Sequence, residues 1–184
     1  MQHVTYDLII SKYPCYNPTI IGMPTDYKDT PVNFVNNYRN KVKKISDIQW
    51  VLLRLDFLTH KELSMYVIWC VRQVQHLMKD ERSIKALDVA EAYVHGSATK
   101  EELLEARNNA FDAYHAARAD ATDATDAVDY AAAYIAADVA AYANAADDDA
   151  VAYAAYRVAN ANAVPIRDAL IDKLLEIFKE KEAA

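Results

Sequence analysis

Glycine and cysteine are scarce in this chain of 184 residues, which contains two of each. Two glycines cannot build a glycine-rich phosphate-binding loop, so the sequence excludes that class of nucleotide site. Cys15 and Cys70 lie far apart and form no CxxC pair, which predicts no disulfide framework and no zinc site and suits a reducing compartment. No segment approaches the roughly 20 apolar residues of a membrane span, and no cationic segment precedes the short apolar run at residues 8–10. We therefore expect a soluble, cytoplasmic protein.

Proline is also rare, and four of the five prolines fall within the first 31 residues. Because each proline fixes φ and removes an amide donor, this clustering predicts an extended N-terminal arm over residues 1–30. A single all-helical domain is expected to follow over residues 31–184. Composition divides this domain into mixed apolar helices (31–98), helices rich in Ala, Tyr and Asp (99–164), and a closing helix (165–184).

Alanine is abundant in the second half of the chain, with 25 alanines between residues 110 and 164 and no Gly or Pro among them. Alanine has the highest intrinsic helix propensity, and its small side chain lets helix axes approach closely. The sequence therefore predicts an all-α fold, a compact bundle of seven or eight helices with tightly packed alanine-rich helices.

Capping signals place the helix boundaries. Three segments have the form of a capping box, at Ser46–Gln49, Thr59–Glu62 and Thr99–Glu102, and Thr30 followed by Pro31 has the form of an N-cap. Asp80 is a further N-cap, and Gly96 stands where a helix C-terminus needs a left-handed residue. The predicted helices are 31–44, an apolar stretch from Ser46 to residue 58, 60–78, 81–95, 100–118, 123–146, 149–163 and 165–182.

The net charge of −7 is unevenly distributed. Residues 1–84 carry 11 Lys and Arg against 8 Asp and Glu, whereas residues 85–184 carry 9 against 19. Nucleic-acid binding through phosphates needs clustered Lys and Arg, so the acidic half argues against a nucleic-acid partner. A basic protein is a better match for this half of the chain.

The most distinctive charged pattern is a ladder of aspartates at every third position, followed by two tyrosines one helical turn apart: Asp120, Asp123, Asp126, Asp129, Tyr130 and Tyr134. Two interpretations remain open. The aspartates can cap a helix and face solvent while the tyrosines pack over alanines of neighbouring helices. Alternatively, these residues form an anionic, tyrosine-bearing face that docks a basic protein.

Few residues could carry out catalysis. Three carboxylate–imidazole pairs have a helical spacing: Glu91 and His95, Asp112 and His115, and His76 and Asp80. Such neighbours are common by chance, and the chain lacks the repeated Glu-x-x-His element of a di-metal bundle. Cys70 lies next to Trp69 in an apolar helical segment, which favours a buried thiol over a nucleophile. We therefore expect no catalytic residue, no metal site and no cofactor.

Several motifs between residues 47 and 165 resemble a known family. They are Asp80-Glu81-Arg82, residues 86–93 (ALDVAEAY), Gly96, and Tyr114-His115-Ala116-Ala117-Arg118 leading into alanine and tyrosine repeats. These motifs resemble the alanine-rich immunity-protein family, also described as the immunity-five-like domain family. Residues 69–77 (WCVRQVQHL) are similar to helical proteins of tailed phages that carry the same domain. The resemblance implies an all-helical inhibitor that neutralises a toxin by binding it, and a phage setting implies a host defence factor as the target in the host cytoplasm.

Two functions from different classes follow as hypotheses. The first is a non-enzymatic immunity or anti-defence inhibitor that binds a basic protein target through the acidic, tyrosine-bearing face. The alternative is an oligomeric sponge that sequesters a small signalling nucleotide in tyrosine-lined pockets. Its phosphates would be held by cationic side chains: Arg72, Arg82, His115, Arg118 and Arg157. Both hypotheses allow a homo-oligomer, and neither involves a membrane.

Overall fold

The structure is a computed structural model that describes residues 2–12, 14, 16–42, 45–54, 56–120 and 165–184. Seven α-helices lie in these ranges: α1 (Tyr6–Ser11), α2 (Pro31–Tyr38), α3 (Ile45–Leu52), α4 (His60–Arg72), α5 (Glu81–Val94), α6 (Lys100–Asp120) and α9 (Pro165–Ala183). Two 3-10 turns and two strands accompany them: η1 (Pro18–Ile21), η2 (Gln75–Leu77), β1 (Val4–Thr5) and β2 (Lys28–Asp29). The predicted all-α fold class is confirmed. The helices predicted at 123–146 and 149–163 lie outside the described residues.

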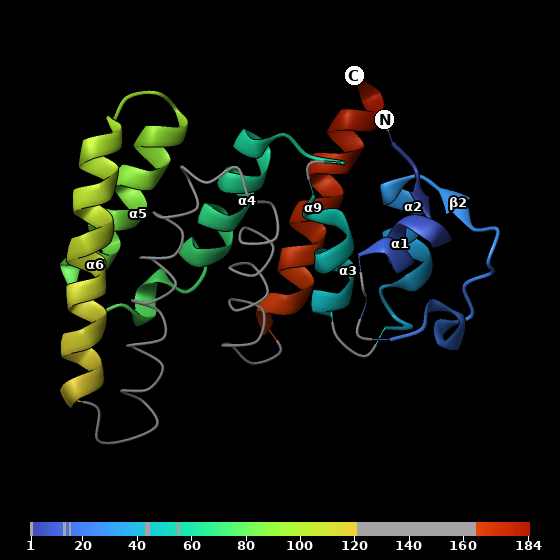
Figure 1. Cartoon of the computed structure of the whole chain (residues 1–184), viewed down its shortest axis with the longest axis horizontal. Helices are drawn as coiled ribbons and strands as arrows, with labels where there is room; N and C mark the ends of the chain where they lie inside the picture. The colour runs from blue at the N-terminus through green and yellow to red at the C-terminus, as the bar shows by residue number, and fades with distance from the viewer. Residues whose placement is uncertain (1, 13, 15, 43–44, 55, 121–164) are drawn as a thin grey trace.

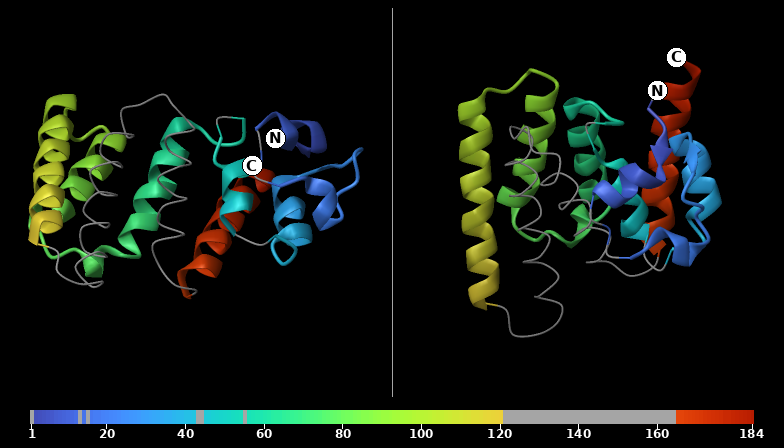
Figure 2. Two further views of the ribbon diagram at one scale, coloured as in Figure 1. Left: turned by 60° about the horizontal axis from the view of Figure 1, so that its bottom comes forward. Right: turned by 45° about the vertical axis from the view of Figure 1, so that its right-hand side comes forward.

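The described helices are arranged in a row (Figure 1). The order along the row is α6, α5, α4 and α9, and α9 also packs against α2 and α3. Figure 2 shows the same order from two further directions, with the two termini near each other. The last helix of the chain therefore lies inside the row instead of closing one end of it, and Leu170, Leu174 and Phe178 are fully buried there.

The N-terminal segment is folded, so the expectation of an extended arm over residues 1–30 is wrong. β1 pairs antiparallel with β2, and α1 begins directly after the N-cap Thr5. Val4, Ile9 and Met23 are buried in the core of the molecule. Pro18 starts the turn η1 and does not extend the chain. The elements here are too short to show a periodic pattern, which is why composition alone suggested an arm.

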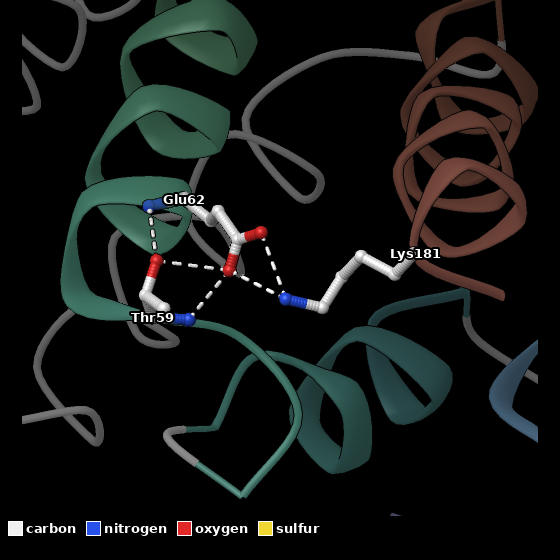
Figure 3. A network of polar contacts seen from close by, with 3 residues as sticks. All are labelled: Thr59, Glu62 and Lys181. Carbon is white, nitrogen blue, oxygen red and sulfur yellow. Dashed lines mark hydrogen bonds and ion pairs between the residues drawn. The ribbon is translucent and has the colours of Figure 1, made fainter. Parts of the chain in front are cut away.

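Capping residues start four helices where the sequence predicts them, and the first is α2, where Thr30 Oγ1 accepts from the Asn33 amide (3.3 Å). At α4 the Glu62 amide donates to Thr59 Oγ1 (3.3 Å) and the Thr59 amide donates to Glu62 Oε2 (2.7 Å), a complete capping box (Figure 3). Thr99 and Glu102 make the same two bonds at the start of α6, at 3.2 and 2.7 Å. Asp80 caps α5. These bonds satisfy amides that have no partner inside the helix.

The end of α5 also matches its prediction. Gly96 adopts φ +77°, the left-handed conformation that residues with a Cβ avoid. The Gly96 amide donates to the Tyr93 carbonyl (2.9 Å) and the Ser97 amide donates to the Ala92 carbonyl (2.8 Å). This pair of bonds is a Schellman motif, and it turns the chain sharply from α5 into α6.

Other boundaries differ from the prediction. α2 ends at Tyr38 and not at residue 44, and α4 ends at Arg72 and not at residue 78. α3 begins at Ile45, so the box predicted at Ser46–Gln49 cannot cap it at Ser46. Gln49 from that box is buried, and its Nε2 donates to Tyr66 Oη (2.9 Å), which in turn donates to the Leu170 carbonyl (2.9 Å). A residue expected to cap a helix therefore joins α3, α4 and α9 in the core.

Ion pairs fix both sides of α9. Arg39 after α2 contacts Asp172 (2.8 Å) and Asp168 (3.1 Å) on α9. Near the other end of the helix, Lys181 Nζ donates to both oxygens of Glu62 at 2.8 Å (Figure 3). Glu62 thus caps α4 and holds α9 with the same carboxylate.

Candidate functional site

The predicted acidic, tyrosine-bearing face lies almost entirely outside the described residues. Asp120 is the last residue of α6. The remaining members of the face, and one arginine of the alternative site, fall in the range 121–164: Asp123, Asp126, Asp129, Tyr130, Tyr134 and Arg157. These assignments stay predictions. The described part of the acidic half that leads up to them is the pair of helices α5 and α6.

α5 and α6 pack closely because small side chains lie between them. Ala90 of α5 and Ala106, Ala110 and Ala113 of α6 are buried, and side chains of this size allow a short distance between helix axes. α6 has 21 residues against 14 in α5, so its last turns extend beyond the start of α5 (Figure 1). α6 also stands at one end of the row of described helices, which leaves much of its surface open.

The exposed side of α6 has a continuous polar stripe. Its members recur at steps of four and three residues and are all exposed: Glu101, Glu105, Asn108, Asp112 and His115. Within the part of the chain that the structure describes, none of its three carboxylates is in an ion pair. Leu104 lies beside the stripe with 51% of its surface exposed. We call these five polar residues the α6 stripe. It is an anionic surface without ion pairs in the described residues, in which Asp112 is attracted by a nearby cation, Arg82, and Leu104 offers an apolar contact point.

Arg72, a candidate for phosphate binding, is hydrogen-bonded to other side chains of the protein. Its Nη1 donates to Gln75 Oε1 (2.7 Å), and its Nη2 donates to Asp88 (2.6 Å) and Glu91 (3.0 Å) of α5. Burial would lower the pKa of Arg72, but the hydrogen bonds to the two carboxylates outweigh it and raise the pKa. The side chain therefore links α4 to α5, and a phosphate would have to displace two carboxylates to reach it.

Arg82 is likewise occupied. Its guanidinium donates to the carboxylate of Asp80 from Nε (3.0 Å) and Nη2 (2.7 Å), and these hydrogen bonds lower the pKa of Asp80. Arg118 donates to Tyr114 Oη (3.3 Å) on the last turns of α6, and His115 is exposed beside them. The structure thus places the four described cationic candidates on three different elements and gives each arginine its own local partner.

A groove of about 400 Å³ runs along one side of the α5–α6 pair. Arg82, Lys85, Val89 and Ala92 line it from α5 at steps of three and four residues. The connecting loop and α6 supply the rest of its surface: Ser97, Ala98, Glu102, Glu105, Ala106 and Asn109. This groove was not predicted from the sequence. The helical spacing of its α5 residues was visible, but nothing in the sequence showed which face of α5 would stay uncovered.

The two helices that line the groove carry charges of opposite sign. Arg82 and Lys85 belong to α5, whereas Glu102 and Glu105 belong to α6. The Thr99 amide lowers the pKa of Glu102 by hydrogen bonding to it, so this carboxylate stays ionised. Among the described residues, Lys85 and Glu105 have no ion-pair partner, and they do not pair with each other across the groove.

Two residues considered for catalysis from the sequence are buried or engaged in the described structure. Cys70 is fully buried, and burial raises the pKa of its thiol to about 12, so it is not a nucleophile at neutral pH. No group of three or more His, Cys, Asp or Glu side chains in these residues could hold a metal ion. Glu91, paired with His95 in the sequence, instead accepts a hydrogen bond from Arg72.

Comparisons with known proteins add no assignment. No family model, no curated protein and no solved structure matches the chain. Among the described helices, none combines the length and the apolar character needed to cross a membrane.

Proposed function

We propose that the protein is a non-enzymatic inhibitor that binds a protein target one to one, as an immunity or anti-defence protein, through the acidic surface of its second half. The observation that supports the proposal most is the α6 stripe, whose exposed carboxylates form no ion pair with any described cation. Such a surface attracts a basic partner over several ångströms and pairs with it on contact. The stripe also runs toward Asp120, where the predicted aspartate ladder begins.

The nucleotide sponge has less support from the described residues. Phosphate recognition needs arginine or lysine donors that are free to converge on one anion. Arg72 and Arg82 are engaged by carboxylates, and the only cation of the groove without an ion-pair partner in the described residues, Lys85, shares the groove with the carboxylates of Glu102 and Glu105. The inhibitor hypothesis needs no such rearrangement.

The proposal can be tested once cross-linking and mass spectrometry of host lysate have identified a candidate target. The E101Q/E105Q/D112N variant removes three charges from the α6 stripe. The D26N/E180Q/E182Q variant removes three exposed charges elsewhere and serves as the matched control. A second test variant replaces Asp120, Asp123, Asp126 and Asp129 together with asparagine.

We expect the stripe variant to bind the target about tenfold more weakly, because each exposed interfacial ion pair contributes about 0.2–1 kcal/mol. Its affinity should also depend less on salt, whereas the control should bind like the unmodified protein. Unchanged affinity and salt dependence in both test variants would reject the acidic surface as the binding site. A nucleotide found on the native protein by mass spectrometry, with no protein partner, would favour the sponge.

A further inference from the structure

We propose that the groove between α5 and α6 holds a short helical segment of the target, with an acidic side chain against the α5 wall and a basic side chain against the α6 wall. This inference rests on the proposed function, because it assigns a docking mode to the same partner. Binding at the groove requires a target that presents both acidic and basic side chains. Binding at the α6 stripe alone requires only basic side chains.

The shape of the groove fits a helix. From Arg82 to Ala92 its α5 wall covers almost three turns, about 15 Å along the axis. Its apolar surface is built from small side chains, Ala92, Ala98 and Ala106 together with Val89. Small residues permit a third helix to approach two others closely, and laying an amphipathic helix into a groove is a common mode of peptide recognition.

The charges of the groove select the occupant. Arg82 is neutralised by Asp80, and Glu102 is engaged by the Thr99 amide, so the two charges free to bind are Lys85 and Glu105. An anion bound to Lys85 alone would share the groove with the carboxylate of Glu105, and a cation bound to Glu105 alone would share it with Lys85. A helix with one acidic and one basic flank meets both charges with the opposite sign.

The experiment uses the full chain, labelled with ¹⁵N, and three synthetic alanine-rich peptides of about 16 residues, long enough to be helical in water. One peptide has Glu on one flank and Lys on the other. The other two replace either that Glu or that Lys with Gln. Titrations followed by NMR give the location of binding from amide shifts and the affinity from their dependence on concentration.

We expect shifts at the amides of the groove residues and an affinity for the two-charge peptide about two- to fivefold above that for either control peptide, the range of an exposed ion pair. The K85Q variant should lose the advantage given by the peptide Glu, and E105Q the advantage given by the peptide Lys. The K61Q/E180Q variant removes one exposed charge of each sign on other helices, and it should keep both advantages.

Shifts away from the groove, equal affinities for the three peptides, or advantages that survive in K85Q and E105Q would overturn the inference. Shifts at the same amides that grow with protein concentration in the absence of peptide would assign the groove to a second copy of this chain and overturn it too. If the groove variants keep full affinity for the target while the stripe variant loses it, only the groove inference fails. If neither set of variants affects target binding, the proposed function fails.

Discussion

Tyr66 offers the sharpest test of how the core is held together. Its hydroxyl accepts a hydrogen bond from Gln49 Nε2 and donates one to the Leu170 carbonyl, each at 2.9 Å, so one oxygen joins α3, α4 and α9. Burial raises the pKa of Tyr66 well above its ordinary value of 10, so the hydroxyl keeps its proton at any physiological pH. The substitution Y66F removes this oxygen and leaves the ring in place.

We expect Y66F to lower the free energy of unfolding by about 2 kcal/mol. Removing one partner of a buried hydrogen bond leaves the other without one, which costs about 1–3 kcal/mol. The main group left without this partner is the amide of Gln49, which is 1% exposed and whose Oε1 already has no hydrogen-bond partner. The buried Cys70 thiol also loses a hydrogen bond to Tyr66, but a thiol is a weak partner. The Leu170 carbonyl loses less, because it lies inside α9, where it also accepts a helical bond.

The Y66F/Q49M double variant tests this reasoning. Replacing both partners by apolar groups of similar shape leaves no unsatisfied amide, so we expect it to recover about 1 kcal/mol relative to Y66F. Urea denaturation measures each free energy, and equal m-values would show that the same surface is exposed on unfolding in all variants. A Y66F protein as stable as the unmodified one, or a double variant less stable than Y66F, would refute the hydrogen-bonded link.

Three further predictions concern single residues. Burial alone would raise the pKa of Glu62, but hydrogen bonds from Lys181 and Thr59 outweigh it and lower the pKa below 4.5. The stability that Glu62 contributes is therefore present above about pH 4.5 and is lost as the pH falls through the lower folded pKa. We expect the urea concentration at the unfolding midpoint to fall less steeply with decreasing pH in E62Q than in the unmodified protein. Gly96→Ala should cost about 1 kcal/mol in urea denaturation, because φ is +77° and no atom lies within 4 Å to clash with the new Cβ. Cys70 should resist iodoacetamide in the native protein and react in urea, as read from the mass of its peptide, because burial raises its thiol pKa to about 12.

Helix starts were predictable from the sequence because the signals that make them are local. Thr59 with Glu62, and Thr99 with Glu102, need only a spacing of three residues to satisfy each other. Gly96 needs only its own freedom to adopt positive φ. Each of these signals involves only residues that are close in the sequence, so the sequence contains all the information needed to predict it.

Helix ends and core contacts were not predictable in the same way. α4 stops at Arg72, whose side chain contacts carboxylates 16 and 19 residues later in the sequence. Gln49 looks like half of a capping box but donates to Tyr66 on another helix. In both cases a distant partner determines the outcome, and the N-terminal segment is a third example because Val4 and Ile9 are buried by contacts with the core.

The candidate site was hidden for a different reason, which also determines how it should be probed. Ala110 and Ala113 are buried, whereas Ala116 and Ala119 on the same helix are exposed, so residue type does not show which face of an alanine-rich helix is covered. Enlarging a buried alanine would strain the helix packing and lower stability, which would make any loss of binding ambiguous. Exposed charges such as Lys85 and Glu105 make no ion pair in the described residues, and replacing them affects the fold little. Charge substitutions on α5 and α6 therefore separate binding from folding, where substitutions of the alanines cannot.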